Sequence, residues 1–261
     1  FNFNMNLRTA VILCGGSGTR LGQLGKKIPK SLVKIQQKPI IWFILKSLKK
    51  NRFNHFILPT GYKGNKIKSY IRQNSEFNNY KIELIDTGNK TSIAKRIFKI
   101  KKFIKSENFL ILNGDSIFDT NLNDIFNIHS KKKHDISFIS CEAKADFGTI
   151  GTIKNKVVNF QRNLSFGSVL TGKKYYLGHV YSGMAIINKK ILSENFKDNV
   201  NFEKEFYPKI IKKYKSSIKK LKGFWCAMDN MKDIDSLNKK KDNFQNYNKV
   251  KRILKILKKL K

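Results

Sequence analysis

The sequence predicts a doubly wound α/β fold of Rossmann-like type, in which helices flank a mostly parallel mixed sheet within a single domain. Two observations support this prediction. Short apolar segments with the composition of strands alternate along the chain with segments of helical periodicity, and this order is typical of a parallel sheet covered by helices. Polar and glycine-rich segments follow several of these strands, at the edge where open α/β sheets bind their ligands.

Strands are expected where apolar segments end at turn residues. They cover 10–14, 53–58, 81–85, 109–112, 136–141, 180–187 and 217–221, with a hairpin made of 147–151 and 157–161. Helices are expected where apolar residues recur at helical spacing. They begin at Pro39, Gly64 and Asn230, run through Arg96 and His129, and cover 202–214 with Ile211 facing inward. Residues 163–178 are polar, and we expect an irregular loop there.

Composition indicates a globular protein with a substantial core. The chain has 261 residues, of which 40% are hydrophobic, and no apolar run approaches the roughly 18 residues of a membrane span. The first residues lack the layout of a signal peptide, and Met5 is a candidate start. Cys14, Cys141 and Cys226 stand far apart, without the spacing of a metal or redox pair. We therefore expect a protein of the reducing cytoplasm.

A formal net charge of +36 is compatible with nucleic-acid binding, but the distribution of the charge argues against a specific site. Lysines are spread from Lys26 to Lys261 among many Asn, Ile and Phe residues. Dispersed lysine gives a solvated basic surface that attracts polyanions only weakly. His129 and His134 lie in one such lysine-rich stretch, where we expect both to be solvated. We expect no specific nucleic-acid partner.

A glycine-rich loop after the first expected strand is the strongest functional signal in the chain. It reads Gly15-Gly16-Ser17-Gly18-Thr19-Arg20-Leu21, and Pro29-Lys30 follow. Glycines allow unusual backbone dihedrals and close approach to a ligand, so several N–H groups of such a loop can face phosphate oxygens. Arg20 adds a forked cation and Lys30 a compact one. The loop therefore predicts a phosphate site; the alternative is a plain strand-to-helix turn with two surface cations.

Two well-known phosphate loops do not match this stretch. The P-loop requires Gly-Lys-Ser/Thr after four spacer residues, which 15–22 lacks. The dinucleotide-binding fingerprint requires a small residue where Leu21 stands. If the loop binds phosphate, it therefore belongs to another class of phosphate site.

Two acidic residues are candidate metal ligands. Asp115 follows Asn113-Gly114 at the end of an expected strand, and Asp229 stands just before the helix that begins at Asn230. A carboxylate beside a glycine at such a strand end suits a metal ion bound to nucleotide phosphates. The alternatives are an Asp115 that caps the next turn and an Asp229 that is a simple turn carboxylate. Because the glycine loop already indicates phosphate, we expect Asp115 to be a metal ligand.

The last segment, 249–261, alternates basic and apolar residues at helical spacing. One stripe consists of Val250, Ile253, Leu254, Leu257 and Leu260, and lysines form the opposite side. One interpretation is a terminal helix docked on the body or on a partner subunit. The other is weak adhesion to an anionic membrane surface, for which the segment is short. We expect the docked arrangement.

Together these motifs resemble the sugar-1-phosphate nucleotidyltransferase family over residues 8–240. Two further stretches are similar to its glucose-1-phosphate cytidylyltransferase branch: Leu84-Ile85-Asp86-Thr87-Gly88 with Thr91 and Arg96, and Gly223-Phe224-Trp225 with Met228-Asp229. The resemblance implies a nucleotidyltransferase domain in 1–240, followed by a basic amphipathic tail in 241–261.

The resemblance also implies roles for individual residues. The nucleotide would contact Leu13, Cys14, Gly15, Gly16, Ser17, Gly18, Thr19, Arg20 and Lys30, and the same site would be lined by Thr91, Arg96 and Gly114. The catalytic residues would be Arg20, Lys30, Asp115 and Asp229, and the last two would hold Mg²⁺. The sugar phosphate would contact Arg162, Ser182 and Gly183.

The sequence departs from the family at positions that bear on the substrates. Phe160-Gln161 is followed by Arg162-Asn163, where the family commonly has a Glu for sugar hydroxyls and a Lys for the sugar phosphate. Ile93-Ala94-Lys95 replace the Thr-Gly-Gly of the cytidylyltransferase branch, and an insert before Asp86 is missing. The resemblance therefore implies the reaction type more firmly than CTP, and CTP more firmly than glucose-1-phosphate.

The implied reaction joins a nucleoside triphosphate, with CTP first among the candidates, to a sugar-1-phosphate and releases pyrophosphate. By the same resemblance, the product would serve nucleotide-sugar and surface polysaccharide biosynthesis, and the enzyme would be compatible with a homo-oligomer. Three alternatives stay open at this point. They are a non-catalytic nucleotide-binding protein, an enzyme of the same fold with another phosphorylated acceptor or nucleotide, and a nucleic-acid-binding protein that relies on bulk charge.

Overall fold

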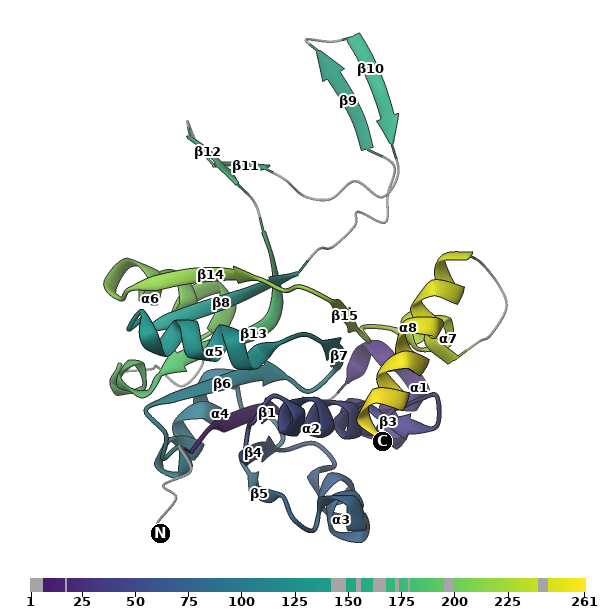
Figure 1. Ribbon diagram of the computed structural model, residues 1–261, viewed down its shortest axis with the longest axis vertical. Helices are drawn as coiled ribbons and strands as arrows, with labels where there is room; N and C mark the ends of the chain where they lie inside the picture. Colours follow the sequence, from purple (N-terminus) through teal and green to yellow (C-terminus); the bar gives the residue numbers. More distant parts are fainter. Residues whose placement is uncertain are drawn as a thin grey trace.

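A seven-stranded sheet forms the centre of the computed structural model, which describes residues 7–16, 18–141, 149–153, 156–161, 168–171, 174–177, 179–194, 200–238 and 244–261. The strand order is β14-β8-β13-β6-β1-β4-β5 (Figure 1). Their bounds are β1 (Thr9–Leu13), β4 (His55–Thr60), β5 (Lys81–Asp86), β6 (Asn108–Asn113), β8 (Ile136–Cys141), β13 (Val180–Asn188) and β14 (Ser216–Lys220). β13 is antiparallel to both of its neighbours, and all other pairs in this sheet are parallel. The predicted mostly parallel mixed sheet is confirmed.

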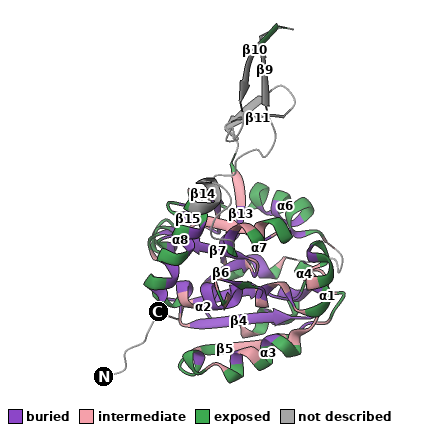
Figure 2. Ribbon diagram, turned by 90° about the vertical axis from the view of Figure 1, so that its right-hand side faces the viewer, coloured by how far each residue is buried: buried purple, intermediate pink, exposed green. Residues whose placement is uncertain are grey.

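Helices cover both faces of this sheet, and the buried residues concentrate between the helices and the strands (Figure 2). The helices are α1 (Gly22–Lys27), α2 (Ile40–Lys50), α3 (Gly64–Gln73), α4 (Ile93–Ile100), α5 (Leu122–Lys131), α6 (Tyr207–Lys213), α7 (Met231–Asn238) and α8 (Phe244–Leu260). On β1, Ala10 and Ile12 join the core that contains residues of α2, α3, α5, α7 and α8, whereas Val11 joins the core beneath α4 and α6. Because both faces are covered, the strand is apolar throughout rather than alternating.

Shorter strands pair as two-stranded ribbons outside the main sheet. They are β2 (Lys34–Ile35) with β3 (Lys38–Pro39), β7 (Ser116–Asp119) with β15 (Phe224–Ala227), β9 (Thr149–Ile153) with β10 (Lys156–Gln161), and β11 (Ser168–Thr171) with β12 (Lys174–Leu177). The predicted hairpin is present as β9 and β10 within its described part. The irregular loop expected over 163–178 is wrong for β11 and β12, where Val, Leu and Tyr residues favour strands.

The helix expected over 202–214 consists of two pieces. A π-helical turn covers Phe202–Phe206, and α6 follows, with Pro208 in its first turn, where a missing N–H costs no hydrogen bond. Ile211, which was expected to face inward, is 49% exposed. A π-helical turn contains more residues than an α-helical turn, so it rotates every later residue around the axis relative to a continuous α-helix.

The C-terminal helix α8 docks on the body of the protein. Val250, Ile253, Ile256, Leu257 and Leu260 are buried, and α8 contacts α2 and α7. The Nζ atom of Lys259 lies 2.6 Å from Oδ1 of Asp119, which joins α8 to β7. The apolar stripe is therefore used inside the protein, with the exception of Leu254, which stays exposed. Among the described residues, no helix is long and apolar enough to cross a membrane.

His129 is buried, contrary to the expectation that it would be solvated. Its Nδ1 atom lies 2.8 Å from Oγ of Ser137, and its Nε2 atom lies 3.2 Å from Oδ1 of Asn108. Burial, followed by the nearby His134, lowers the pKa of His129 to about 4. The burial of His129 could not be predicted from its lysine-rich surroundings in the sequence, because those lysines lie on the outer face of α5 while His129 itself faces β8.

We expect the free energy of unfolding to decrease as the pH falls from 6.5 towards about 4. The unfolded chain binds a proton at the ordinary histidine pKa, whereas folded His129 stays neutral until about pH 4, so protonation favours the unfolded state in this window. Urea denaturation of the wild type and of His129→Gln at pH 7 and pH 5 checks this. The decrease should be smaller in His129→Gln; equal decreases in both proteins would contradict the assignment.

Candidate active site

The glycine loop has the geometry of a ligand-binding turn. β1 lies between β4 and β6, so the loop leaves the sheet at its centre, at the carboxyl ends of three parallel strands. Gly18 has φ of 64°, a left-handed conformation that favours glycine, and it leads into a short 3-10 helix over Thr19–Leu21. A Cβ atom on Gly114, at the end of the neighbouring β6, would lie 2.7 Å from the carbonyl oxygen of Leu13. Glycine is therefore favoured at position 18 by the left-handed turn and at position 114 by the close approach of the ends of β1 and β6.

The buried side chain of Arg96 anchors the glycine loop by hydrogen bonds to backbone carbonyl groups. It is 4% exposed, and its guanidinium donates hydrogen bonds to the carbonyl oxygens of Gly15 at 2.9 Å, Thr60 at 2.9 Å and Asn89 at 3.4 Å, and to the hydroxyl of Thr87. A Cβ atom on Gly15 would collide with this guanidinium, so the glycine is needed for the contact. Arg96 thus connects the ends of β1, β4 and β5 and leaves few donors for a ligand.

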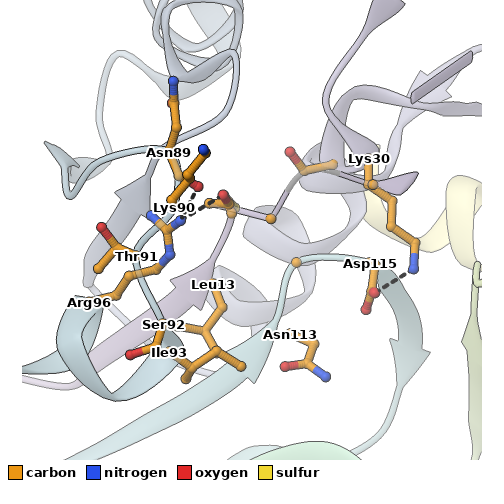
Figure 3. A pocket seen from close by; sticks show the side chains of 16 residues that line it. Leu13, Lys30, Asn89, Lys90, Thr91, Ser92, Ile93, Arg96, Asn113 and Asp115 are labelled. Atoms are coloured by element: carbon orange, nitrogen blue, oxygen red, sulfur yellow. Dashed lines mark hydrogen bonds and ion pairs between the residues drawn. The ribbon is translucent and has the colours of Figure 1, made fainter. Parts of the chain in front are cut away.

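A cavity of about 510 Å³ lies over these strand ends. Its walls include Leu13, Cys14, Gly15, Gly16 and Gly18 of the glycine loop, Lys30, the segment Asn89–Ile93 with Arg96, and Asn113–Asp115 (Figure 3). Thr91 lies in this wall, and its hydroxyl donates to the carbonyl oxygen of Thr87 at 2.6 Å. The volume is in the range of pockets that hold a small organic ligand. Predicted nucleotide-site residues from four parts of the chain thus line one cavity.

The ribbon of β7 and β15 brings two distant carboxylates together. Ser116 pairs with Ala227 at the end of this ribbon, so Asp115 precedes one strand and Asp229 follows the other at the same end. The backbone N–H of Met228 donates to the carbonyl oxygen of Asp115 at 2.9 Å, which fixes the two loops. The backbone N–H groups of Asp229 and Asn230 donate to Oδ2 of Asp233, as expected for a capped start of α7.

Lys30 lies between these two carboxylates. Its Nζ atom is 2.7 Å from Oδ2 of Asp115 and 3.1 Å from Oδ1 of Asp229, and its side chain is 17% exposed. Figure 3 shows Lys30 and Asp115 pointing towards each other across the cavity from Arg96. Arg20 is more exposed, and its Nη1 atom approaches Oδ1 of Asp229 only to 3.4 Å. Four residues predicted to be catalytic therefore converge on one point.

A second cavity of about 180 Å³ adjoins the first at Asn113 and Asp115, which line both. Its other walls are Ser116, Tyr181, Ser182, Gly183, Glu203, Trp225, Ala227 and Asp229. A β-bulge at Ser182-Gly183 interrupts the pairing of β13 with β8, and Gly183 has φ of 77°. The Ser182 hydroxyl donates to the carbonyl oxygen of Ile139 at 2.7 Å, so Ser182 is buried against β8 rather than turned to a ligand.

The donor set at this junction fits Mg²⁺. Two carboxylates from different loops already share one cationic nitrogen, which demonstrates that the pair is arranged around a single positive charge. The described residues include no cluster of three or more His, Cys, Asp or Glu side chains that could enclose a metal without other ligands. Mg²⁺ commonly takes one or two carboxylates and completes its shell with water and substrate phosphates.

Cys14 is a buried thiol in the wall of the larger cavity. Burial raises the pKa of the Cys14 thiol to about 12, although Cys14 lines the larger cavity. A thiol of this pKa stays protonated near neutral pH, and the thiolate is the reactive form. Cys14 is therefore a small buried side chain rather than a nucleophile.

Two predicted site residues, Ser17 and Arg162, lie outside the described residues. Sequence reasoning missed others that the cavities contain, notably Asn113, Asn89, Trp225 and Glu203. Asn113 and Asn89 stand within motifs already recognised, at the ends of β6 and β5, and could have been found from that position. Glu203 follows no strand end and matches no motif, so only the folded chain reveals it.

Comparison with known proteins agrees with this geometry. Residues 9–162 match the sequence profile of the family described as "Nucleotidyl transferase". The chain is 31% identical over 250 residues to the "probable glucose-1-phosphate cytidylyltransferase" of Bacillus subtilis, with 88% of this chain and 94% of that protein covered. It is 31% identical over 206 residues to the "D-glycero-alpha-D-manno-heptose 1-phosphate guanylyltransferase" of Aneurinibacillus thermoaerophilus, with 77% and 84% covered.

A solved structure shares the fold. HddC from Yersinia pseudotuberculosis, crystallised with GMP-PN, superposes with a TM-score of 0.64 at 24% identity, over 87% of this chain and 96% of that one. The family profile spans more than half of the chain, and its matched region contains the glycine loop, Lys30 and Asp115. The chain belongs to the nucleotidyl transferase family of enzymes.

Proposed function

We propose that the protein joins a nucleoside triphosphate, CTP in the first place, to a sugar-1-phosphate, and releases pyrophosphate and a nucleotide sugar. The observation that carries this proposal is the position of Asp115, Asp229 and Lys30 where two cavities meet. The larger cavity has the volume and the glycine loop for a nucleotide, and the smaller one adjoins it at the charged junction. The two substrates would thus meet beside these three side chains.

The chemistry requires charge to be offset rather than a proton to be removed. A phosphate monoester oxygen is already anionic at neutral pH and attacks the α-phosphorus, while pyrophosphate leaves. The N–H groups of the glycine loop would bind the triphosphate, and Lys30 would offset charge near the α-phosphate or the incoming phosphate. Arg20 lies at the exposed rim of the site, where its guanidinium would stabilise the departing pyrophosphate. Catalysis would then consist of positioning and electrostatic stabilisation.

Asp115 and Asp229 would hold Mg²⁺ in this proposal. The ion, when bound, would supply charge neutralisation and orientation of the phosphates. Lys30 keeps the two carboxylates at one point by offsetting the repulsion between them. The carboxylates would therefore be ready for the cation that accompanies the nucleotide.

Two relatives suggest different nucleotides. The Bacillus subtilis protein is named for transfer of a cytidylyl group to glucose-1-phosphate, and the Aneurinibacillus protein for transfer of a guanylyl group to a heptose phosphate. CTP is favoured here because the first relative matches more of this chain and because Asp86-Thr87-Gly88 resembles the cytidylyltransferase loop. GTP is the second candidate. Surface polysaccharide biosynthesis would be the use of either product.

A substrate matrix tests the proposal. The four nucleoside triphosphates are each combined with glucose-, mannose-, galactose- and heptose-1-phosphates in the presence of Mg²⁺, and released pyrophosphate is measured. We expect turnover with CTP to exceed turnover with the other nucleotides. If pyrophosphate were released with GTP alone, GTP would take the place of CTP in the proposal. If no pair of substrates released pyrophosphate, the proposal of an active transferase of this class would be contradicted.

Arg20→Ala should reduce kcat/KM by a factor that corresponds to about 2 kcal/mol or more, the usual scale for removing one charge-stabilising group from a transition state. Because the Arg20 side chain is 77% exposed, the fold should be unaffected. Steady-state kinetics with the best substrate pair checks this, with the exposed Arg72→Ala on α3 as a control. An unchanged kcat/KM in Arg20→Ala would remove Arg20 from the mechanism.

A further inference from the structure

We propose that Glu203 selects the acceptor, by accepting hydrogen bonds from the hydroxyl groups of an uncharged sugar ring in the smaller cavity. This inference rests on the proposed function and specifies its acceptor. The sequence resemblance would put a sugar-binding carboxylate after Phe160-Gln161, where this chain has Arg162-Asn163. Glu203 would supply a carboxylate from a different part of the chain.

The charge of the smaller cavity is unusual for this protein. The chain contains 54 Lys and Arg residues against 18 Asp and Glu residues. The described lining of this cavity nevertheless contains three carboxylates, those of Asp115, Asp229 and Glu203, and no Lys or Arg. Lys30 offsets the charges of Asp115 and Asp229, so Glu203 is the carboxylate of this lining that no described cation pairs with, and such a group repels anions and attracts hydrogen-bond donors. The acceptor must therefore direct a neutral part into this cavity and leave its phosphate at the junction beside Lys30.

Among the glutamates in the described part of the chain, Glu203 is the one whose carboxylate forms no hydrogen bond or ion pair with a described residue. Glu76, Glu83, Glu107, Glu194 and Glu205 each accept a hydrogen bond or form an ion pair. No hydrogen bond or ion pair links the Glu203 carboxylate to any described residue, although it lines the cavity. Its acceptor capacity is thus available to a ligand.

The backbone of Glu203 is held firmly at this position. Oδ1 of Asn201 accepts hydrogen bonds from the N–H groups of Glu203 at 3.1 Å and Lys204 at 2.8 Å. Phe202 and Phe206, on either side, are buried, and their rings stack with centroids 4.5 Å apart. A site on an anchored element places its functional group more accurately than a free loop does. Glu203 is therefore positioned accurately enough to discriminate between similar acceptors.

The remaining walls suit a sugar ring. Tyr181 and Trp225 supply aromatic surface, and both are fixed, since the Tyr181 hydroxyl lies 3.0 Å from that of Tyr207 and Nε1 of Trp225 donates to the carbonyl oxygen of Ser182 at 3.0 Å. Ser116 is 1% exposed and lines the same cavity, and its hydroxyl has no hydrogen-bond partner among the described residues. A volume of about 180 Å³ is below the roughly 300–1,000 Å³ of pockets for whole drug-sized ligands, so it suits one ring.

Acceptor selectivity follows from these features. Glu203 is exposed at the edge of the cavity, and a carboxylate that accepts hydrogen bonds from ring hydroxyls penalises acceptors in which a hydroxyl is missing, because one of these charge-assisted hydrogen bonds is then lost. It also penalises acceptors that carry a carboxylate of their own, such as a uronic acid 1-phosphate, by repulsion between like charges. We therefore assign the acceptor to the neutral sugar-1-phosphates and exclude the acidic ones.

Kinetics with three proteins test this assignment: the wild type, Glu203→Gln, and Glu205→Gln as a neighbouring control on the same turn. The acceptors are the best sugar-1-phosphate of the substrate matrix, its monodeoxy derivatives, and glucuronic acid 1-phosphate. We expect Glu203→Gln to raise the KM for the acceptor about tenfold, and the KM for the nucleotide by less than about twofold. At least one deoxy derivative should be penalised by the wild type and not by Glu203→Gln, and discrimination against glucuronic acid 1-phosphate should decrease.

The kinetic results distinguish a failure of the role of Glu203 from a failure of the proposed transferase activity. Turnover by the wild type, combined with an unchanged acceptor KM and unchanged deoxy penalties in Glu203→Gln, would overturn the role of Glu203 and leave the transferase activity intact. Equal effects in Glu205→Gln would indicate disturbance of the turn and would also overturn it. If the wild type turns over no sugar-1-phosphate, the proposed function fails, and this inference fails with it.

Discussion

Asp229→Asn should abolish pyrophosphate release while the protein keeps its fold, and Asp115→Asn should do the same. Each substitution removes a negative charge from the point where the two carboxylates meet Lys30, so a divalent cation would lose one of its two protein ligands. The Asp229 side chain is half exposed, and Asn is close to Asp in size, so packing should change little. Activity at saturating Mg²⁺ and thermal unfolding of the same samples measure the two effects separately.

Asp235→Asn is the matched control for this prediction. Asp235 is exposed on α7, six positions after Asp229, and lines none of the described cavities. It should retain the wild-type rate. Purified Asp229→Asn that worked at the wild-type rate in saturating Mg²⁺ would contradict the metal assignment.

Arg96→Ala should weaken both the fold and nucleotide binding. The substitution removes the guanidinium hydrogen bonds to the carbonyl oxygens of Gly15, Thr60 and Asn89, of which that of Thr60 still accepts from the backbone N–H and the hydroxyl of Thr87. Hydrogen bonds to a charged group contribute about 1.5–3 kcal/mol each, and partial replacement by water reduces the total, so we expect a loss of about 2–4 kcal/mol in the free energy of unfolding. The glycine loop would lose its anchor, so the Kd for the nucleotide should rise about tenfold or more.

Arg96→Lys separates charge from geometry in this prediction. Lysine keeps the positive charge but lacks the planar fork that reaches several acceptors, so it should recover little of either loss. Urea denaturation and calorimetric titration with CTP measure the two quantities, with Arg72→Ala as the control at an exposed helical arginine. If Arg96→Ala kept the stability of the wild type but bound the nucleotide weakly, Arg96 would act on the ligand directly. That result would contradict the structural role that its buried hydrogen bonds indicate.

The main sheet and the larger cavity could be predicted because their signals are local in the sequence. The glycine loop after β1, and Gly114-Asp115 directly after Asn113 at the end of β6, are recognisable without knowledge of the rest of the chain. Parallel strands deliver their carboxyl ends to one edge, so residues after different strands meet there. The interpretation of Gly18 as a residue with unusual dihedrals followed from the same local reasoning.

Other features depend on contacts that no local pattern encodes. The pairing of β7 with β15 determines that Asp115 and Asp229 share Lys30, and it joins segments more than a hundred residues apart. Arg96 was expected to line the nucleotide site, but the depth at which it is buried depends on three strand ends and could not be read from its helix. Glu203 and the exposure of Ile211 both depend on the π-helical turn, which has no distinct sequence signal.

Binding of Mn²⁺ as a probe for Mg²⁺ tests most directly whether Asp115 and Asp229 hold one ion. The signal of free Mn²⁺ in electron paramagnetic resonance is titrated in the presence of a CTP analogue that cannot react, and the binding of the analogue alone is subtracted. We predict that Asp115→Asn and Asp229→Asn lose the same protein-dependent site and that Asp235→Asn retains it. Loss of the site in only one of the two variants, or in neither, would contradict a shared ion.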